Sequence, residues 1–154
     1  MNIIIQISIL LLFLGCSNLN KVKENSPLVN LVVKQDKYSL ILKQHFYKNF
    51  KTNSNNLNIF TVVTNLKFNE KSALSNSGTN NLNLIKGTVD FQIFNKSKTK
   101  LISSSSISSS INTGAVSSLY GIDENNNFVK ERLSKYLASK LHRNVLLKIR
   151  NSEN

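Results

Sequence analysis

The stretch LNLIKGTVDFQIF, residues 82–94, is the most informative about the fold, because its apolar side chains alternate with polar ones. Successive side chains of a β-strand point to opposite faces of a sheet. The alternation therefore predicts a strand with one face in a core and the other toward solvent. The apolar residues that share one face are Ile85, Val89, Phe91 and Ile93.

Two further strands flank this one. Before it, a strand is predicted with Phe60, Val62, Leu66 and Phe68 on one side, followed by a polar hairpin loop over residues 70–81. After it, residues 95–100 predict a basic turn that leads into a third strand. In that strand Leu101, Ile107 and Ile111 are all odd-numbered, which places their side chains on the same face. The serines of residues 103–110 could instead form a disordered linker, but the interrupting isoleucines favour a strand.

Two amphipathic helices complete the domain. Asp36 is a candidate N-cap, and apolar residues follow it at spacings of three and four up to Phe50. A second helix is predicted to begin within residues 123–127, after a turn at Tyr120-Gly121, and to end near Arg150. Its predicted apolar stripe consists of Val129, Leu133, Tyr136, Leu137, Leu141 and Val145.

A short Val-rich run, residues 28–33, adds a strand before the first helix. The predicted order is therefore β-α-β-β-β-α. Both helices bury their apolar stripes if they lie on one face of the sheet. We expect an α+β sandwich: a mostly antiparallel four-stranded sheet with two helices on one face.

The N-terminus indicates export. Residues 3–14 form an apolar run, too short for the roughly 20 residues of a spanning helix but suited to a signal peptide. The run ends in Leu12-Phe13-Leu14-Gly15-Cys16, which resembles a bacterial lipobox. In such a sequence the cysteine thiol receives a diacylglycerol before cleavage on its amino side, and several acyl chains on one residue anchor a protein firmly. An ordinary signal peptide or a start-transfer anchor with an incidental cysteine is the alternative.

This motif sets the expected organisation of the chain. Residues 1–15 are predicted to be a lipoprotein signal peptide, 16–27 a lipidated tether, 28–150 a single domain and 151–154 a disordered tail. Ser17 directly after the cysteine resembles lipoproteins that are sorted to an outer membrane. We therefore expect a protein anchored by lipid, including palmitate, on the periplasmic side of the outer membrane, with no cofactor besides the covalent lipid on Cys16.

Composition excludes several functions. With one cysteine and two histidines, a Cys/His zinc cluster is impossible. The net charge of +12 attracts polyanions, yet an exported protein rarely meets nucleic acid, so we expect no nucleic-acid partner. Asp90 is an isolated acid expected on the outer sheet face. His45 is expected to pack within the domain, and His142 is expected at the edge of the apolar stripe, next to Leu141. No catalytic constellation is present in the sequence, and we expect no enzyme.

The second half of the chain resembles the lipopolysaccharide (LPS) assembly lipoproteins of the LptE type, especially their alphaproteobacterial forms. Residues 86–93, KGTVDFQI, resemble the family's Gly-Thr-x-x-(aromatic)-x-(apolar) strand, and Tyr120-Gly121 stands where the family has Tyr-Ala. The run Glu131-Arg132-Leu133-Ser134, then Leu137-Ala138 and Leu141, resembles the family's last helix. The order of elements from Leu28 onward is also similar.

The resemblance implies a function without catalysis. Such lipoproteins plug a large outer-membrane β-barrel protein, help it to fold and assist insertion of LPS into the outer membrane. They are also thought to bind LPS directly. Lysines in loops at the sheet ends could pair with phosphates of the ligand, unless they only keep these loops soluble. The candidate lysines are Lys67, Lys71, Lys96, Lys98 and Lys100.

Two other functions remain open from the residues alone. The first is an auxiliary lipoprotein of an ABC-type lipid transport system, which would also be an exported α+β domain on an acylated cysteine. The second is a structural lipoprotein that binds no ligand.

Overall fold

The computed structural model describes residues 28–49, 59–74, 81–95, 97–113 and 118–153. Its elements are β1 (Leu28–Val32), α2 (Lys37–Lys48), β2 (Ile59–Leu74), β3 (Asn81–Phe94), β4 (Leu101–Thr113) and α3 (Leu119–Glu153). The α+β class and the predicted order are confirmed. The predicted leader and tether, 1–27, lie outside the described residues, as does Phe50.

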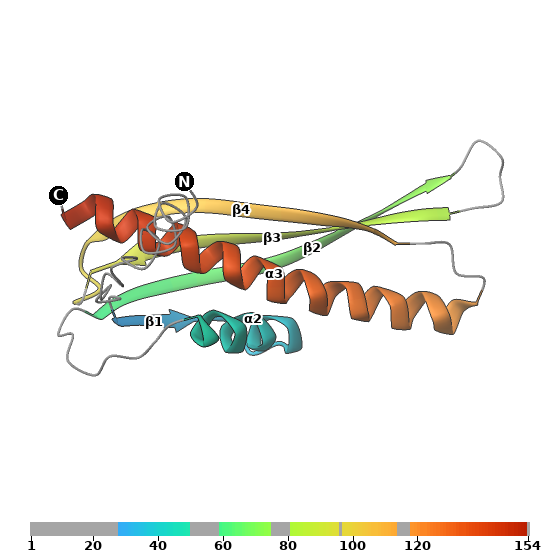
Figure 1. Cartoon of the computed structure of the whole chain (residues 1–154), viewed down its shortest axis with the longest axis horizontal. Coiled ribbons are helices and arrows are strands. Elements are labelled where there is room, and N and C mark those ends of the chain that lie inside the picture. Colours follow the sequence, from blue (N-terminus) through green and yellow to red (C-terminus); the bar gives the residue numbers. More distant parts are fainter. Residues whose placement is uncertain (1–27, 50–58, 75–80, 96, 114–117, 154) are drawn as a thin grey trace, which may run out of the picture.

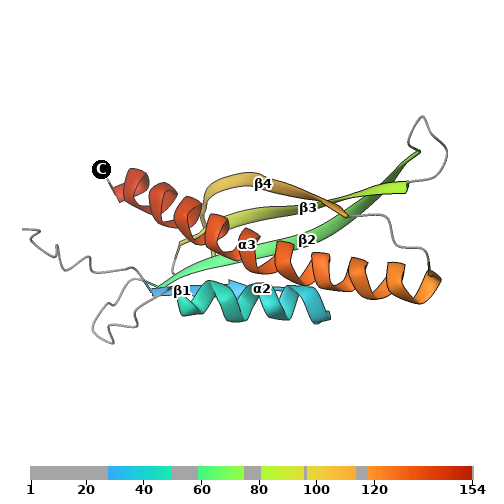
Figure 2. The same ribbon diagram turned by 45° about the vertical axis from the view of Figure 1, so that its right-hand side comes forward.

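The four strands form one sheet in the order β1-β2-β3-β4. β1 runs parallel to β2, whereas β2–β3 and β3–β4 are antiparallel hairpin pairs. Both helices pack on the same face of this sheet (Figures 1 and 2). The result is the two-layer sandwich that the alternation and the two apolar stripes predicted.

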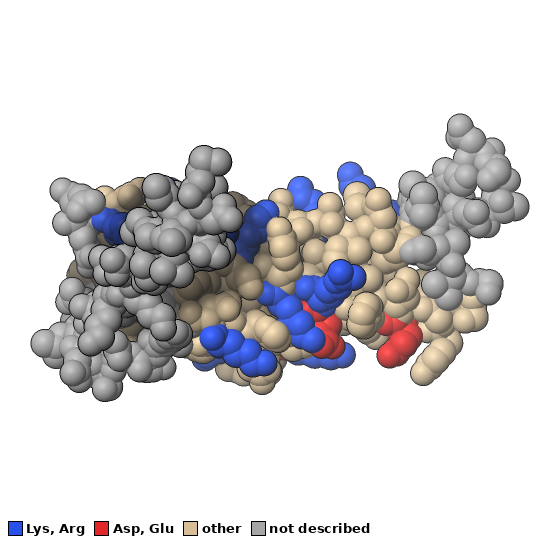
Figure 3. Space-filling view, viewed as in Figure 1, with Lys and Arg blue, Asp and Glu red and all other residues tan. Residues whose placement is uncertain are grey.

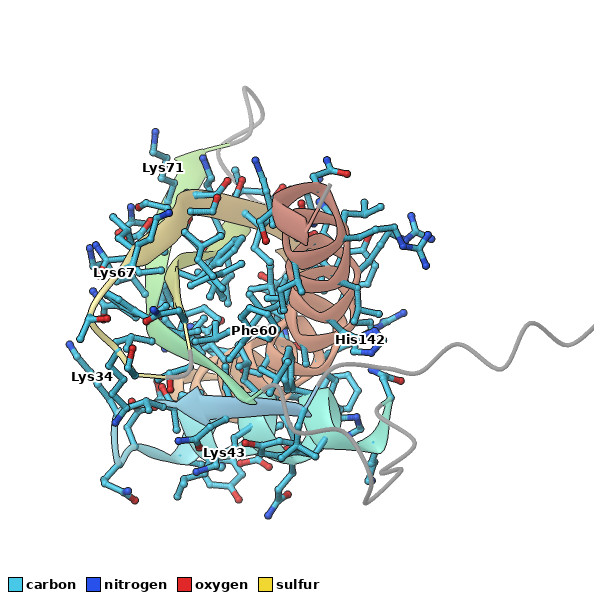
Figure 4. All side chains as sticks on the ribbon, turned by 90° about the vertical axis from the view of Figure 1, so that its left-hand side faces the viewer. Lys34, Lys43, Phe60, Lys67, Lys71 and His142 are labelled. Atoms are coloured by element: carbon cyan, nitrogen blue, oxygen red, sulfur yellow. The ribbon has the colours of Figure 1, made fainter. Side chains whose placement is uncertain are left out.

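The core lies between the sheet and the helices. It joins alternate residues of the strands to the inner sides of α2 and α3. Phe60 lies between the two layers when the molecule is viewed down its long axis (Figure 4). Fully buried members include Leu31, Leu42, Phe46, Val62, Val89, Phe91, Ile93, Leu137 and Leu141.

The hairpin of β2 and β3 is longer than the sequence predicted. Residues 70–74, expected in a polar loop, continue β2 and pair with residues 81–85 of β3. Beside the first half of α3, the two strands form a ribbon at the right of Figure 1, where Ile85 packs on Val129 and Leu133. The residues of this ribbon form strands without a strict alternation of apolar and polar side chains, because their backbone N–H and C=O groups form hydrogen bonds across the hairpin. Glu70 also holds it to α3 through Lys130, with a distance of 2.6 Å between Nζ and Oε1.

The serine-rich stretch is strand β4, as favoured, and not a linker. Ile107 faces the core as predicted, but Leu101 does not. The register between β3 and β4 shifts at Ile93/Phe94, so Leu101 pairs with Phe94 and remains 49% exposed. Ile102 packs against the core instead. A bulge of this kind reverses the face of residues beyond it.

Helix α3 begins earlier and ends later than expected. Tyr120 and Gly121, predicted as a turn, lie in its first turn, where the Ser118 hydroxyl accepts a hydrogen bond from the Gly121 N–H at 3.0 Å. Residues 151–153, expected in a disordered tail, are helical. Tyr136, expected in the apolar stripe, is 54% exposed. The buried stripe instead follows a spacing of four through Val129, Leu133, Leu137, Leu141, Val145 and Ile149.

Candidate ligand-binding face of the sheet

The sheet face that the helices leave uncovered is rich in polar side chains. On β2 and β3 every second residue faces the core, so the residues between them point outward. Asp90 is among these, as predicted, with its side chain 47% exposed. Figure 4 shows Lys67 and Lys71 projecting on the side of the sheet that is remote from α3. This outer face is the candidate site.

Three lysines gather on this face. Lys67 and Lys71 belong to β2, and Lys86 of β3 pairs with Asn69, which lies between them in the sequence. Diagonal neighbours across two strands lie roughly 7–8 Å apart, so the Lys86 side chain is within reach of both β2 lysines. We call Lys67, Lys71 and Lys86 the lysine triangle. Three ammonium groups at this spacing can donate charge-assisted hydrogen bonds to one phosphorylated ligand.

Lys67 is also paired with an acid. Its Nζ lies 3.1 Å from Oδ2 of Asp90, in an ion pair open to solvent on both sides. Hydrogen bonds from Ser106 and from Lys67 hold the pKa of Asp90 below its usual value. Asp90 is therefore a carboxylate at neutral pH and fixes the position of the Lys67 ammonium. In the part of the chain that the structure describes, no ion pair joins Lys71 or Lys86 to an acid.

A shallow hollow adjoins this pair. Its volume is about 240 Å³, and Asn65 and Asp90 stand directly opposite each other in its wall. The Oδ1 atom of Asn65 is buried and has no hydrogen-bond partner in the structure. Because this atom has almost no accessible surface, it can accept a hydrogen bond from a ligand only after the Asn65 side chain turns toward the hollow. The lining residues are Val63, Thr64, Asn65, Asp90, Phe91, Gln92 and Ser104.

The structure separates the lysines that the sequence grouped as candidates. Lys71, expected in the hairpin loop over residues 70–81, is a strand residue on the outer face, as is Lys67, which precedes that loop. Lys98 and Lys100 lie in the turn between β3 and β4, where the Asn95 side chain accepts hydrogen bonds from the N–H groups of Thr99 and Lys100. Lys96 lies outside the described residues. Lys67 pairs with Thr88 of β3, and the turn follows Phe94, six residues further along that strand. The turn is therefore about 20 Å from Lys67 along the sheet.

Lys86 was not among the candidates from the sequence. The sequence already indicates that Lys86 points away from the core, because the core-facing residues predicted for the strand over residues 82–94 are odd-numbered. The missing information was the register between β2 and β3. That register depends on the length of the hairpin, and only the structure shows that it places Lys86 between Lys67 and Lys71.

The two histidines lie on the helical side. His142 is in edge contact with Phe46, with 6.0 Å between ring centroids, and this contact joins α3 to α2 (Figure 4). Burial first, and then the charges of Lys48 and Lys135, lower the pKa of His45. Among the described residues, no group of three or more His, Cys, Asp or Glu side chains could hold a metal ion. No helix in the described ranges is long and apolar enough to span a bilayer.

The fold belongs to a class that bacterial lipoproteins adopt. One similar solved structure is the minor lipoprotein from Acinetobacter baumannii, with a TM-score of 0.57 and 15% identity, covering 79% of this chain and 94% of that one. Another is the rare lipoprotein B from Shewanella oneidensis, with a TM-score of 0.59 and 10% identity, covering 82% of this chain and 99% of that one. No protein-family model matches the chain. No curated protein matches its sequence either.

Proposed function

We propose that this chain is an outer-membrane lipoprotein of the LPS-assembly type. Acyl chains on Cys16 anchor it to the periplasmic side of the membrane. There it associates with a large β-barrel protein as a plug, helps the barrel to fold and assists the insertion of lipopolysaccharide. The function is not catalytic.

One combination of observations supports the proposal most strongly: a lipobox-like leader joined to a fold that bacterial lipoproteins share. The strand around Gly87-Thr88 and the helix from Glu131 to Leu141 add the family resemblance. In the structure these two motifs pack against each other, since the backbone of Gly87 lies beneath Leu137. The resembling residues therefore form one packed unit and are not scattered similarities.

The outer sheet face supports the choice of ligand. Lipid A carries phosphates, and the lysine triangle offers three ammonium groups on one open surface. The neighbouring hollow adds Asn65 and Gln92, whose amides can bind hydroxyl groups of a glycolipid. We therefore propose that LPS binds to this face and not to the turn that carries Lys98 and Lys100.

Replacing the lysine triangle tests this ligand site. The triple variant Lys67→Gln, Lys71→Gln, Lys86→Gln should bind purified LPS at least about tenfold more weakly, because each charge-assisted hydrogen bond contributes on the order of 1.5–3 kcal/mol. The measurement is titration of the full chain in detergent with LPS.

A control variant removes the same total charge elsewhere. Lys43→Gln, Lys98→Gln, Lys100→Gln should bind LPS almost as the wild type does, because Lys43 lies on α2 and the other two in the distant turn. Equal loss in both variants would show nonspecific attraction by net charge. Loss in the control variant alone would move the site to the turn.

A further inference from the structure

A line of exposed side chains runs along α3 on the side that faces away from the sheet and α2, the elements that the structure describes. Phe128, Arg132, Tyr136, Arg143 and Leu147 are spaced by four or seven residues, which places them on one face of a helix. We call these five residues the α3 stripe. Its three apolar members are unusually open for their size: Phe128 is 63%, Tyr136 54% and Leu147 51% exposed.

Contacts on both flanks of the helix show that the stripe faces outward. On one flank His142 meets Phe46 of α2. On the other flank the Nζ atom of Lys140 donates a hydrogen bond to the Ser108 carbonyl of β4, at 3.0 Å. The inner side carries the fully buried Leu137 and Leu141. Only the stripe side is left, and all five of its residues are exposed.

The charge on this half of α3 is positive except at its last residue, Glu153. Residues 132–152 contain six Lys or Arg residues and no Asp or Glu. Glu131, the last acid before this segment, is already paired with Lys135 at 2.6 Å. Figure 3 shows basic side chains gathered over the middle of the helical face, with acidic side chains beside some of them. Among the residues that the structure describes, no ion pair joins Arg132 or Arg143 to an acid.

We propose that the α3 stripe is a membrane-docking face that lies flat on an anionic lipid surface. A helix that binds in the plane of a membrane places aromatic and aliphatic side chains at the headgroup boundary, with Lys and Arg reaching for anionic headgroups. Phe128, Tyr136 and Leu147 supply the first part, and Arg132 and Arg143 the second. From Phe128 to Leu147 the stripe is about 28 Å long, so it is a line of contact and not a single point.

The same observations argue against a protein as the occupant. Stable protein interfaces have a core from which charged residues are depleted. In the stripe, cations alternate with apolar residues, so no charge-free core exists. A second copy would bring Arg132 and Arg143 against the same unneutralised surface of its partner, which like-charge repulsion disfavours. A lipid surface is compatible with alternating cationic and apolar residues, because long Arg side chains extend to the headgroups while aromatic rings stay at the headgroup boundary.

This inference goes beyond association with a barrel. It describes how the anchored domain lies when no partner covers α3. It does not involve the lysine triangle, which lies on the opposite face of the molecule. A negative result for LPS binding or for barrel association would therefore not contradict membrane docking of the α3 stripe. A negative result for membrane docking would likewise not contradict the proposed function.

Tryptophan placed on the stripe tests the proposal directly, because the chain contains none of its own. The full chain with Phe128→Trp or Leu147→Trp is inserted into vesicles of phosphatidylcholine with one third phosphatidylglycerol. The phosphatidylcholine carries bromine on its acyl chains, which quenches indole fluorescence on contact. We expect several-fold stronger quenching than for the control Val63→Trp, which lies on the outer sheet face. The quenching should fall at high salt and in vesicles of phosphatidylcholine alone.

Removing the two stripe arginines supplies the second comparison. Arg132→Gln with Arg143→Gln, in the Phe128→Trp background, should shift the balance away from the docked state by about 30-fold, since each basic residue near an anionic surface contributes on the order of 1 kcal/mol. Circular dichroism checks that each variant is folded. Quenching no stronger than that of Val63→Trp would overturn the proposal. A blue-shifted but unquenched indole would mean that a protein covers the stripe, and would overturn it too.

Discussion

Gly87 determines how closely α3 approaches the sheet. A Cβ atom at this position would lie 2.8 Å from Cδ1 of Leu137 and 3.2 Å from Cε1 of Phe68. Leu137 is fully buried, so its side chain has little room to move away. The Gly-Thr pattern noticed in the sequence therefore reflects a packing requirement, namely a strand without a side chain at the point where the helix crosses it.

Gly87→Ala should reduce the free energy of unfolding by about 1–3 kcal/mol, the usual cost of overpacking a core. Urea denaturation of the purified chain measures it. The same substitution in a Leu137→Ala background should cost clearly less, because the clashing Cδ1 atom is gone. Equal costs in both backgrounds would show that the contact between Gly87 and Leu137 is not the cause.

Asp36 is the second residue with a defined local role. Its carboxylate accepts hydrogen bonds from the N–H groups of Tyr38 and Ser39, at 3.1 and 2.9 Å, and from the Ser39 hydroxyl at 2.7 Å. Desolvation by partial burial raises the pKa of Asp36, but these hydrogen bonds outweigh it, so the pKa lies below the usual 3.8. The predicted N-cap of α2 is thereby confirmed.

A lowered pKa makes this contribution depend on pH with a definite sign. The stabilisation is complete above the unfolded pKa of 3.8 and is lost as the pH falls through the lower, folded value. At neutral pH, Asp36→Ala should cost about 0.5–2 kcal/mol. The difference between wild type and variant should shrink in acid. Asp36→Asn keeps a capping oxygen but cannot titrate, so it should retain most of the stability without this change. A constant difference across the pH range would refute the assignment.

At the scale of elements, local signals in the sequence predicted local features. Alternation located β2, β3 and β4, and a capping residue with a three-four spacing located α2. Long-range pairing was not predictable in this way. The polar end of β2 is a strand only because β3 lies beside it, and Leu101 leaves the core only because a bulge shifts β4. The lysine triangle depends on the same register, and for this reason Lys86 was missed.

The position of Tyr136 illustrates a different limit. On a long helix, residues spaced by three and residues spaced by four lie on two neighbouring faces. The sequence alone does not show which of these faces is buried, and Tyr136 was predicted to lie on the buried one. In α3 the larger apolar buried residues follow a spacing of four from Val129 to Ile149, so the buried side moves around the helix as it crosses the twisted sheet. The twist of a sheet cannot be read from the sequence of the helix that packs on it.

Two substitutions on this helix should therefore differ sharply. Leu133→Ala removes a fully buried side chain and should cost about 2–5 kcal/mol of unfolding free energy. Tyr136→Ala removes an exposed ring, and the change should stay within about 0.5 kcal/mol. Thermal and urea unfolding of both variants measure the contrast. A larger loss for Tyr136→Ala would restore the face that the sequence suggested.

At the scale of the whole molecule, the two faces have different proposed roles. The outer sheet face offers the lysine triangle and the hollow to a phosphorylated glycolipid, and the opposite helical face offers the α3 stripe to a membrane. The core between them holds both surfaces on one rigid sandwich. The proposed anchor at Cys16 precedes β1 by a segment of the chain, residues 17–27, and would keep the whole domain close to lipid.

Native mass spectrometry of the chain extracted from its own membranes tests whether an acylated lipoprotein associates with a barrel protein. We predict a chain that begins at Cys16, bears acyl groups on that residue and is bound to one large outer-membrane protein, with Cys16→Ala left unprocessed as the control. A solitary chain with a free thiol at Cys16 would contradict the account.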